Sequence, residues 1–280
     1  MEKISSREFE GERPLYNMHG LEIEDVTIHP GESSVKECSQ VEAHDSRFEG
    51  KYVFWCGKDI AVRNCTFAPS ARSSVWHTEG ISMEDCVVDA PKMFRECDGV
   101  RLKNVRLTDA QETFWSCRNI EIEDVEAAGA DYIFMWCENV KVRGLKLHGN
   151  YSFQHARNVE IHDSDLQSKD SLWECENITV YNSFINGEYL AWHSKNVRLV
   201  NCRIGGTQPL CYADGLVLEN CTFEPDADLA FEYSDVQATV LGAIPSVKNP
   251  RTGFIKAAGF GEIIIDGNVK APADCRIEKI

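Results

Sequence analysis

The sequence predicts an all-β fold: a single-stranded right-handed parallel β-helix of about eleven coils. Between Leu21 and Leu216 the chain repeats one short phrase eleven times, namely an apolar residue, any residue, an apolar residue, any residue, and usually Asn or Asp. Successive phrases begin 19 to 21 residues apart. A fixed period of this length is typical of a solenoid, in which each repeat forms one coil and packs on its neighbours.

Each phrase is predicted to form a strand with one buried face, because apolar residues alternate with period two, as in residues 60–63 (IAVR). The Asn or Asp that follows, such as Asn64, tolerates left-handed backbone angles and predicts a bend. A second column of Gly or Asn, such as Gly80, precedes each phrase and predicts another bend. Two bends and a loop of variable length give three short strands per coil, which favours a parallel β-helix over a leucine-rich or helical repeat.

The repeat runs without a linker, so we expect one continuous structural domain. In this prediction residues 18–233 form the β-helix, residues 1–17 an N-terminal cap and residues 234–280 a C-terminal β cap. Both terminal segments depart from the repeat pattern. Covering segments are expected there because the open ends of a β-helix would expose unpaired backbone groups.

The composition excludes several kinds of partner. The 45 acidic and 29 basic residues give a net charge of −16, and an acidic chain without a basic stripe repels phosphate backbones, so we expect no nucleic-acid partner. No segment reaches the ~20 apolar residues needed to cross a bilayer, so we expect no membrane partner. Residues 1–14 lack the apolar stretch of a secretory signal, although a processed mature protein would read the same way.

The cysteines follow the repeat rather than a metal-binding pattern. The chain has twelve, and no pair has the CxxC spacing. Nine of them fall in two repeat columns. One column lies three residues before the first residue of the phrase and contains Cys38, Cys97, Cys117, Cys137 and Cys175. The other lies five residues after that first residue and contains Cys65, Cys86, Cys202 and Cys221. Other coils carry small residues in these columns, so we predict stacked, buried free thiols in a reducing compartment, and no metal or cofactor. A metal site is the alternative.

All six tryptophans gather at one place in the repeat. An apolar column rich in Phe precedes them, and a column rich in His and Glu follows. We call these three columns the strip. Each coil contributes three consecutive residues to it, from residues 54–56 in one coil to residues 210–212 in the last. If the Phe column points inward, strict alternation turns the Trp column outward, and the rings could stack on sugars. If a bulge intervenes, Trp points inward and the His/Glu column is exposed. The cost of leaving six Trp side chains in water favours this second arrangement.

The His/Glu column contains the candidate catalytic residues. His155, Glu174 and His193 occupy the same place in successive coils and should form a row with steps of ~4.8 Å. A carboxylate between two imidazoles can hold one of them in its proton-accepting tautomer, or bind a cation. A ladder of solvated polar side chains without chemistry is the alternative. We assign ligand-binding roles to six further residues of the strip: His77, Arg95, Glu96, Trp173, Trp192 and Tyr212.

The spacing of carboxylates restrains an enzymatic interpretation. Glu96 and Glu174 lie four coils apart, or ~19 Å at the strand spacing of a sheet. That separation is too large for the paired carboxylates of a glycosidase. A hydrolase or lyase would therefore have to recruit a loop residue such as Lys169, Asp170 or Glu188.

Four segments resemble a bacterial family known as domain of unknown function 3737: residues 9–16 (FEGERPLY), 150–159 (NYSFQHARNV), 187–197 (GEYLAWHSKNV) and 206–216 (GTQPLCYADGL). The resemblance extends over essentially the whole chain. It implies a single-stranded right-handed β-helix in the cytoplasm. It implies no activity, substrate or catalytic residue. A broader likeness to pectate-lyase and polygalacturonase β-helices concerns architecture alone, because a fold does not determine a function.

Two functions of different classes remain open. The first is a carbohydrate-binding or carbohydrate-active protein, similar to a glycosidase or lyase, that uses the strip and has an oligosaccharide as partner. In it Trp173 and Trp192 would be platforms for the sugar. The second is a non-catalytic scaffold or protein-interaction solenoid, in which the strip packs in the core and the acidic faces bind a partner. Solvent exposure of the Trp column distinguishes the two.

Overall fold

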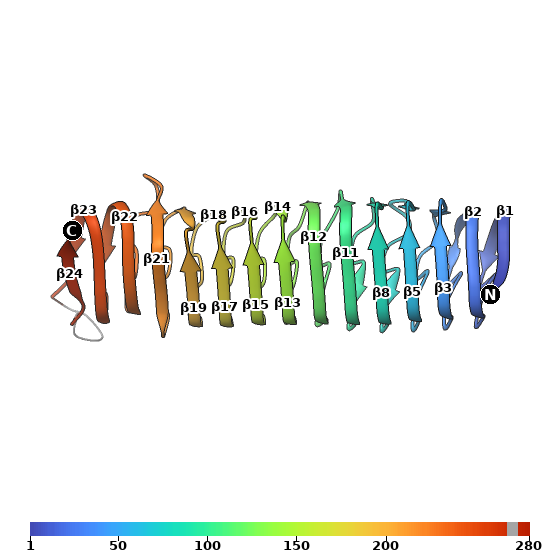
Figure 1. Ribbon diagram of the computed structural model, residues 1–280, viewed down its shortest axis with the longest axis horizontal. Coiled ribbons are helices and arrows are strands. Elements are labelled where there is room, and N and C mark those ends of the chain that lie inside the picture. Colours follow the sequence, from blue (N-terminus) through green and yellow to red (C-terminus); the bar gives the residue numbers. More distant parts are fainter. Residues whose placement is uncertain (268–273) are drawn as a thin grey trace. The chain divides into compact units, whose positions relative to one another are not determined.

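The computed structural model describes residues 1–267 and 274–280, and its regular elements are all β-strands (Figure 1). The described residues contain no helix, and hence none that is long and apolar enough to cross a membrane. Strands of successive coils pair in parallel, which confirms the predicted β-helix. The chain divides into two compact units, residues 1–146 and residues 147–280, and each is described by itself.

In the first unit, strands one coil apart pair in the register that the repeat predicts. Leu21 pairs with Val41, Val41 with Ile60, and Ile60 with Ile81. The strands are β1 (Glu2–Glu12), β2 (His19–Glu32), β3 (Ser39–His44), β4 (Arg47–Phe48), β5 (Lys58–Arg63), β6 (Thr66–Phe67), β7 (Val75–Trp76), β8 (Glu79–Glu84), β9 (Val87–Val88), β10 (Phe94–Arg95), β11 (Asp98–Leu107), β12 (Arg118–Ala128) and β13 (Glu138–Arg143). Strand β14 (Lys146–His148) begins at the last residue of this unit.

The second unit has the same register, with Val159 opposite Ile178 and Ile178 opposite Val197. Its strands are β15 (Arg157–His162), β16 (Asp165–Gln167), β17 (Glu176–Tyr181), β18 (Phe184–Asn186), β19 (Lys195–Val200), β20 (Arg203–Gly205), β21 (Leu216–Phe223), β22 (Asp235–Lys248), β23 (Thr252–Ile264) and β24 (Arg276–Lys279). The terminal segments continue the parallel pairing: β1 pairs with β2, and β22, β23 and β24 follow β21.

The two bends of each coil lie at the predicted columns. Asn64 has a φ of 48° and Gly80 a φ of 71°, both in the left-handed region. Side chains of the bend residues form ladders between coils: the Asn64 amide donates to Asp45 at 2.6 Å, and the Asn177 amide donates to Asn158 at 3.1 Å. These ladders hold neighbouring coils in register because each amide can accept from one side and donate to the other.

The core contains ladders of rings and thiols. Phe114 stacks between Phe94 and Phe134, with ring centroids 4.7 and 4.6 Å apart. The nine cysteines of the two predicted columns are buried free thiols, as the sequence predicts. Burial raises the pKa of Cys65 and of Cys175 to about 12, so these thiols stay protonated near neutral pH. Cys65 and Cys175 are therefore packing residues, because the thiolate is the form that binds metals and attacks substrates.

Candidate functional site

The side chains of the strip point outward in two adjacent columns. Leu172 is buried and has a φ of 58°, Trp173 is half-buried, and Glu174 is exposed with a φ of 52°. Left-handed residues on both sides of Trp173 bend the chain into a tight arc. The strict alternation of a flat strand is lost there, and two consecutive side chains share the outer face. The inward arrangement of the Trp column, which the cost of exposure favoured, is therefore wrong.

In residues 147–280, two of the three candidate catalytic residues lie together. His155 Nδ1 is 3.3 Å from Glu174 Oε2, and the two side chains are 33% and 52% exposed. Among the described residues, Glu174 forms no ion pair with His193. The His193 ring instead stacks on Tyr212, with centroids 4.8 Å apart and planes 21° apart. The structure thus gives one carboxylate–imidazole pair and a separate His–Tyr stack, rather than a carboxylate between two imidazoles.

The aromatic residues beside this pair form a continuous ladder. The ring centroids of Trp173 and Trp192 are 5.3 Å apart, those of Trp192 and Tyr212 are 5.0 Å apart, and those of Tyr212 and Tyr233 are 5.5 Å apart. The Trp192 indole N–H donates to the backbone carbonyl of Gln208 at 2.7 Å. Because neighbouring rings cover part of one another, the ladder forms a half-buried apolar band. This overlap lowers the cost of placing Trp on the surface.

A further column, three residues before the Trp column in each coil, borders the Trp ladder. Of its residues, the sequence singles out Asp170 but gives no role to Tyr189. Tyr189 contacts Trp192 edge to face, with centroids 5.0 Å apart, and Lys169 lies over the Tyr151 ring at 5.3 Å. The same column holds Asp170, and burial raises the pKa of its carboxyl while Lys169 opposes that rise. Tyr three residues before the Trp column, as at Tyr52, is the sequence signal that could have revealed it.

We expect Asp170→Asn to stabilise the protein near neutral pH. Burial disfavours the ionised carboxylate, so the stability contributed by Asp170 is present below its unfolded pKa of ~3.9 and is lost as the pH rises through the higher folded pKa. Asn also accepts the left-handed φ of 51° at this position. Urea unfolding at several pH values should show that the free energy of unfolding of the variant exceeds that of the wild-type protein at pH 7, and that this difference shrinks toward pH 4. An equal gain at both pH values would contradict this account.

In residues 1–146, the strip carries a sandwiched cation. The Arg95 guanidinium lies 4.5 Å from the ring centre of Trp76 and 5.2 Å from that of Trp115. Its charge is balanced by Glu112 at 3.5 Å, and its buried Nε has no hydrogen-bond partner among the described residues. Cation–π contacts of this kind hold a guanidinium at a fixed place on a surface. Arg95 therefore takes the place of a ring in this part of the ladder.

The same unit repeats the carboxylate–imidazole pair. His77 Nδ1 lies 3.3 Å from Glu96 Oε2, and both side chains are exposed. The structure thus pairs these two predicted ligand-binding residues with each other, beside Arg95. In both units an imidazole of one coil contacts a carboxylate of the next, as the common column position predicts.

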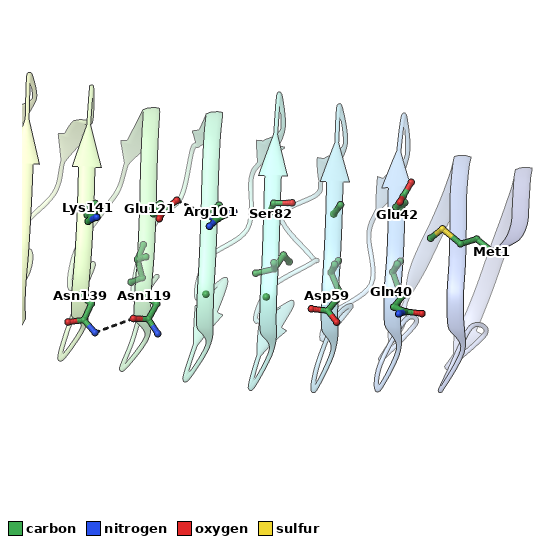
Figure 2. A pocket seen from close by; sticks show the side chains of 17 residues that line it. Met1, Gln40, Glu42, Asp59, Ser82, Arg101, Asn119, Glu121, Asn139 and Lys141 are labelled. Carbon is green, nitrogen blue, oxygen red and sulfur yellow. Dashed lines mark hydrogen bonds and ion pairs between the residues drawn. The ribbon is translucent and has the colours of Figure 1, made fainter.

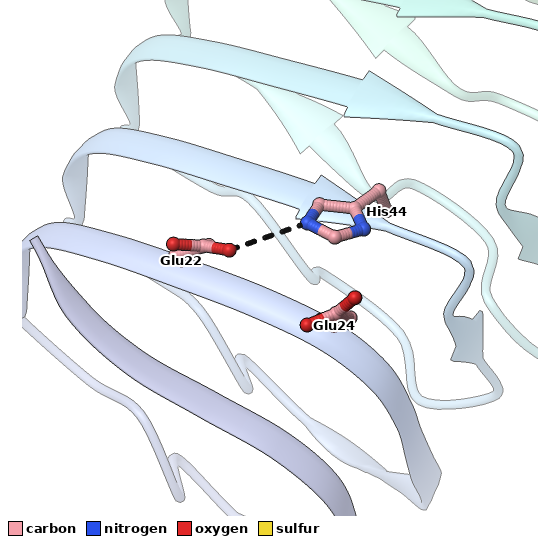
Figure 3. A group of neighbouring side chains, drawn as sticks. All are labelled: Glu22, Glu24 and His44. Carbon is pink, nitrogen blue, oxygen red and sulfur yellow. Dashed lines mark ion pairs between the residues drawn. The ribbon is translucent and has the colours of Figure 1, made fainter.

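A third cluster, distinct from the strip, brings together Glu22, Glu24 and His44 (Figure 3). Their potential ligand atoms all lie within 4.8 Å of one another. The Lys3 ammonium contacts both carboxylates, at 2.9 Å from Glu22 and 2.5 Å from Glu24. The hydrogen bond from Lys3 is also the main reason that the pKa of Glu22 is lowered. Lys3 supplies here the positive charge that a cation would bring, so the cluster is best described as an ion-pair network.

The chain matches a known protein family over nearly its whole length. The family described as "Protein of unknown function (DUF3737)" matches residues 2–278. Among curated proteins, none matches the sequence.

Solved structures resemble the chain only distantly. The Streptococcus pneumoniae surface adhesin PfbA has 9% identity and a TM-score of 0.41, with 86% of this chain and 82% of the adhesin covered. The A-module of the Azotobacter vinelandii mannuronan C-5 epimerase AlgE4 has 10% identity and a TM-score of 0.30, with 100% and 89% covered. At these values neither likeness bears on the function of this chain.

Proposed function

Because this chain belongs to the DUF3737 family, whose function is unknown, we propose its function from its own surface: it binds a neutral oligosaccharide along the strip of residues 147–280. The observation that carries this proposal is the half-buried ladder of Trp173, Trp192 and Tyr212 beside the ion pair of the half-buried His155 with the exposed Glu174. Aromatic surface next to a few hydrogen-bonding side chains is the usual composition of a small-molecule site.

The backbone of the strip favours a ligand that is recognised by side chains. The amide of Glu174 donates to the carbonyl of Trp192 at 2.8 Å, and the amide of His155 donates to that of Trp173 at 2.9 Å. These backbone amides and carbonyls already form hydrogen bonds between neighbouring coils, so an extended peptide could not pair with them as an added strand. A sugar chain needs none, because aromatic rings and polar side chains can contact its C–H and hydroxyl groups. The net charge of −16 favours a neutral glycan over a polyuronate.

The His155–Glu174 pair gives the site its capacity for acid–base chemistry. A carboxylate that contacts an imidazole nitrogen orients the ring and stabilises its protonated form. Such a group acts as a general base toward a hydroxyl bound next to it, and contributes typically ~10²–10⁴-fold to a rate. We assign the base role to His155 and the orienting role to Glu174, with Trp192 and Tyr212 contacting the sugar.

A second function is supported by a different observation. The rings of the ladder cover one another, and the Trp192 N–H is already bonded to Gln208. Aromatic rings that mainly contact one another can serve to stabilise the packing of successive coils rather than to bind a ligand. In that case the chain is a non-catalytic scaffold, and its acidic faces bind a protein partner.

The two functions can be distinguished with a library of neutral and uronate oligosaccharides. Binding of each member is measured, and any reaction products are identified by mass spectrometry. We expect the wild-type protein to bind a neutral member, and Glu174→Gln to retain binding within about threefold while any turnover falls by ~10²-fold or more. Glu160→Gln is the matched control, because Glu160 is also exposed and contacts a histidine, His162, at 2.8 Å. Absence of binding to every neutral member would overturn the proposal. Equal losses of turnover in Glu174→Gln and Glu160→Gln would remove the catalytic role.

A further inference from the structure

In residues 1–146, basic side chains gather in three successive coils of the repeat. We call these coils the basic segment, and count each from four residues before the Trp column to one residue after it: residues 72–77, 91–96 and 111–116. Arg72 is exposed and forms no ion pair or side-chain hydrogen bond with the described residues. Lys92 and Arg95 are 36% and 25% exposed. The Trp76 indole N–H donates to the carbonyl of Lys92 at 2.9 Å, so both cations lie next to this ring.

The basic segment is positive although the chain as a whole is acidic. Its three basic side chains face two carboxylates, Glu96 and Glu112, which gives a formal charge of +1 with His77 neutral. In residues 147–280, the equivalent positions of the coils from residue 150 to residue 212 have a formal charge of −2, from one basic and three acidic side chains: Lys169, Asp170, Glu174 and Glu188. The two parts of the strip therefore favour ligands of different charge.

One carboxylate serves two cations in the basic segment. Glu112 contacts the Lys92 ammonium at 3.0 Å and the Arg95 guanidinium at 3.5 Å. By contrast, Arg101 on strand β11 has a carboxylate of its own, that of Glu121 at 3.0 Å (Figure 2). The shared carboxylate balances only one of the two charges, which leaves the place beside Arg95 able to attract an anion.

The Arg95 guanidinium is fixed in place but makes few polar contacts. It lies between the rings of Trp76 and Trp115, 4.5 and 5.2 Å from their centres. Among the described residues, none accepts a hydrogen bond from its five N–H groups. The two terminal nitrogens of a guanidinium can donate to both oxygens of a carboxylate at once. A held guanidinium with unused donors is therefore suited to a carboxylate ligand.

We propose that the basic segment binds a saccharide that carries one uronate, at a site independent of the neutral-sugar site of residues 147–280. Arg95 holds the carboxylate, and Arg72 and Lys92 add positive charge around it. One carboxylate matches the formal charge of +1, whereas the net charge of −16 repels the further carboxylates of a polyuronate. The ligand is therefore a saccharide with one acidic end or branch, rather than an acidic polymer.

The surroundings of Arg95 favour a sugar over an acidic peptide. The amide of His77 donates to the carbonyl of Arg95, and that of Glu96 donates to the carbonyl of Trp115, both at 2.9 Å. A peptide therefore cannot pair with these backbone groups as an added strand. The side chains of His77 and Glu96 are exposed in the next column and can form hydrogen bonds with sugar hydroxyls.

Pairs of ligands that differ only in charge test the carboxylate. The probes are three disaccharides, namely glucuronate–xylose, galacturonate–rhamnose and glucuronate–galactose, and the methyl ester of each. Esterification removes the charge and keeps the sugar. In calorimetry we expect the wild-type protein to bind at least one acid about tenfold or more tightly than its ester, because a charge-assisted bidentate contact is lost.

The Arg95→Lys variant tests the geometry of this contact. Lysine keeps the positive charge but lacks the planar fork, so binding of the preferred acid should weaken about tenfold. Arg118→Lys is the matched control, because Arg118 also contacts a carboxylate, that of Asp98 at 2.8 Å, and lies outside the strip. This control should bind the acid as the wild-type protein does.

A second variant keeps the test valid if Arg95→Lys folds poorly. Arg72→Ala removes an exposed side chain without a described partner, and it should weaken binding of the acid several-fold. The variant Trp173→Ala, Trp192→Ala should leave this binding intact, so a failure of the neutral-sugar site is distinguishable from a failure here. Equal affinity for every acid and its ester overturns the proposal, as does normal binding by both arginine variants. Hexaglutamate bound as tightly as the preferred acid would overturn the assignment to a sugar.

Discussion

Replacing Trp173 and Trp192 together by alanine is expected to weaken binding of the neutral oligosaccharide selected by the strip at least a hundredfold. The two rings are adjacent in the ladder, 5.3 Å apart, and Trp192 also contacts Tyr212. Truncation of a Trp at the centre of a binding surface typically costs ~2 kcal/mol or more, so two such losses exceed a factor of ~100. Both side chains are half-buried on the outer face, so the core remains packed in the variant.

Calorimetric titration measures this loss, and Tyr181→Ala provides the matched control. Tyr181 is a half-buried ring in the same unit that stacks on His162 at 4.6 Å, outside the strip. The control should bind normally. Equal affinities of the tryptophan double variant and the Tyr181 variant would show that the ladder takes no part in binding.

The Phe114→Ala substitution is expected to destabilise residues 1–146 by ~3–5 kcal/mol. The Phe114 ring has no exposed surface and stacks on both sides, at 4.7 Å from Phe94 and 4.6 Å from Phe134. Alanine removes both contacts and leaves a cavity, because the neighbouring coils are fixed by their backbone pairing and cannot close the gap.

Urea unfolding followed by circular dichroism checks this value, with each transition fitted separately because coils of a repeat protein can unfold stepwise. Thr108→Ala is a mild control, since its hydroxyl makes one exposed hydrogen bond, to Asp89. That variant should lose less than ~1 kcal/mol. A loss below ~1 kcal/mol for Phe114→Ala would show that the Phe ladder does not stabilise the core.

The sequence predicts the fold well because each coil repeats the same physical requirements. Period-two alternation places Ile60 and Val62 in the core, and Asn64 supplies the left-handed bend that follows. A constant repeat length then brings equivalent residues of successive coils into register, as for Ile60 and Ile81. These requirements can be read from residue types and spacing alone.

The direction in which the Trp side chains of the strip point could not be predicted in this way. It depends on left-handed angles at residues such as Leu172 and Phe114, whose side chains give no signal for them. Column positions correctly predicted that His155 and Glu174 are neighbours, but they could not show that His193 stacks on Tyr212.

Hydroxyl-radical footprinting with the selected neutral oligosaccharide tests the central claim, that the strip of residues 147–280 binds sugar, most directly. It reports the solvent exposure of each aromatic side chain in the presence and absence of ligand. We predict that oxidation of Trp173, Trp192 and Tyr212 falls several-fold when the ligand is bound, while oxidation of Tyr181 is unchanged. Saturating ligand with unchanged oxidation of all three strip residues would contradict the account.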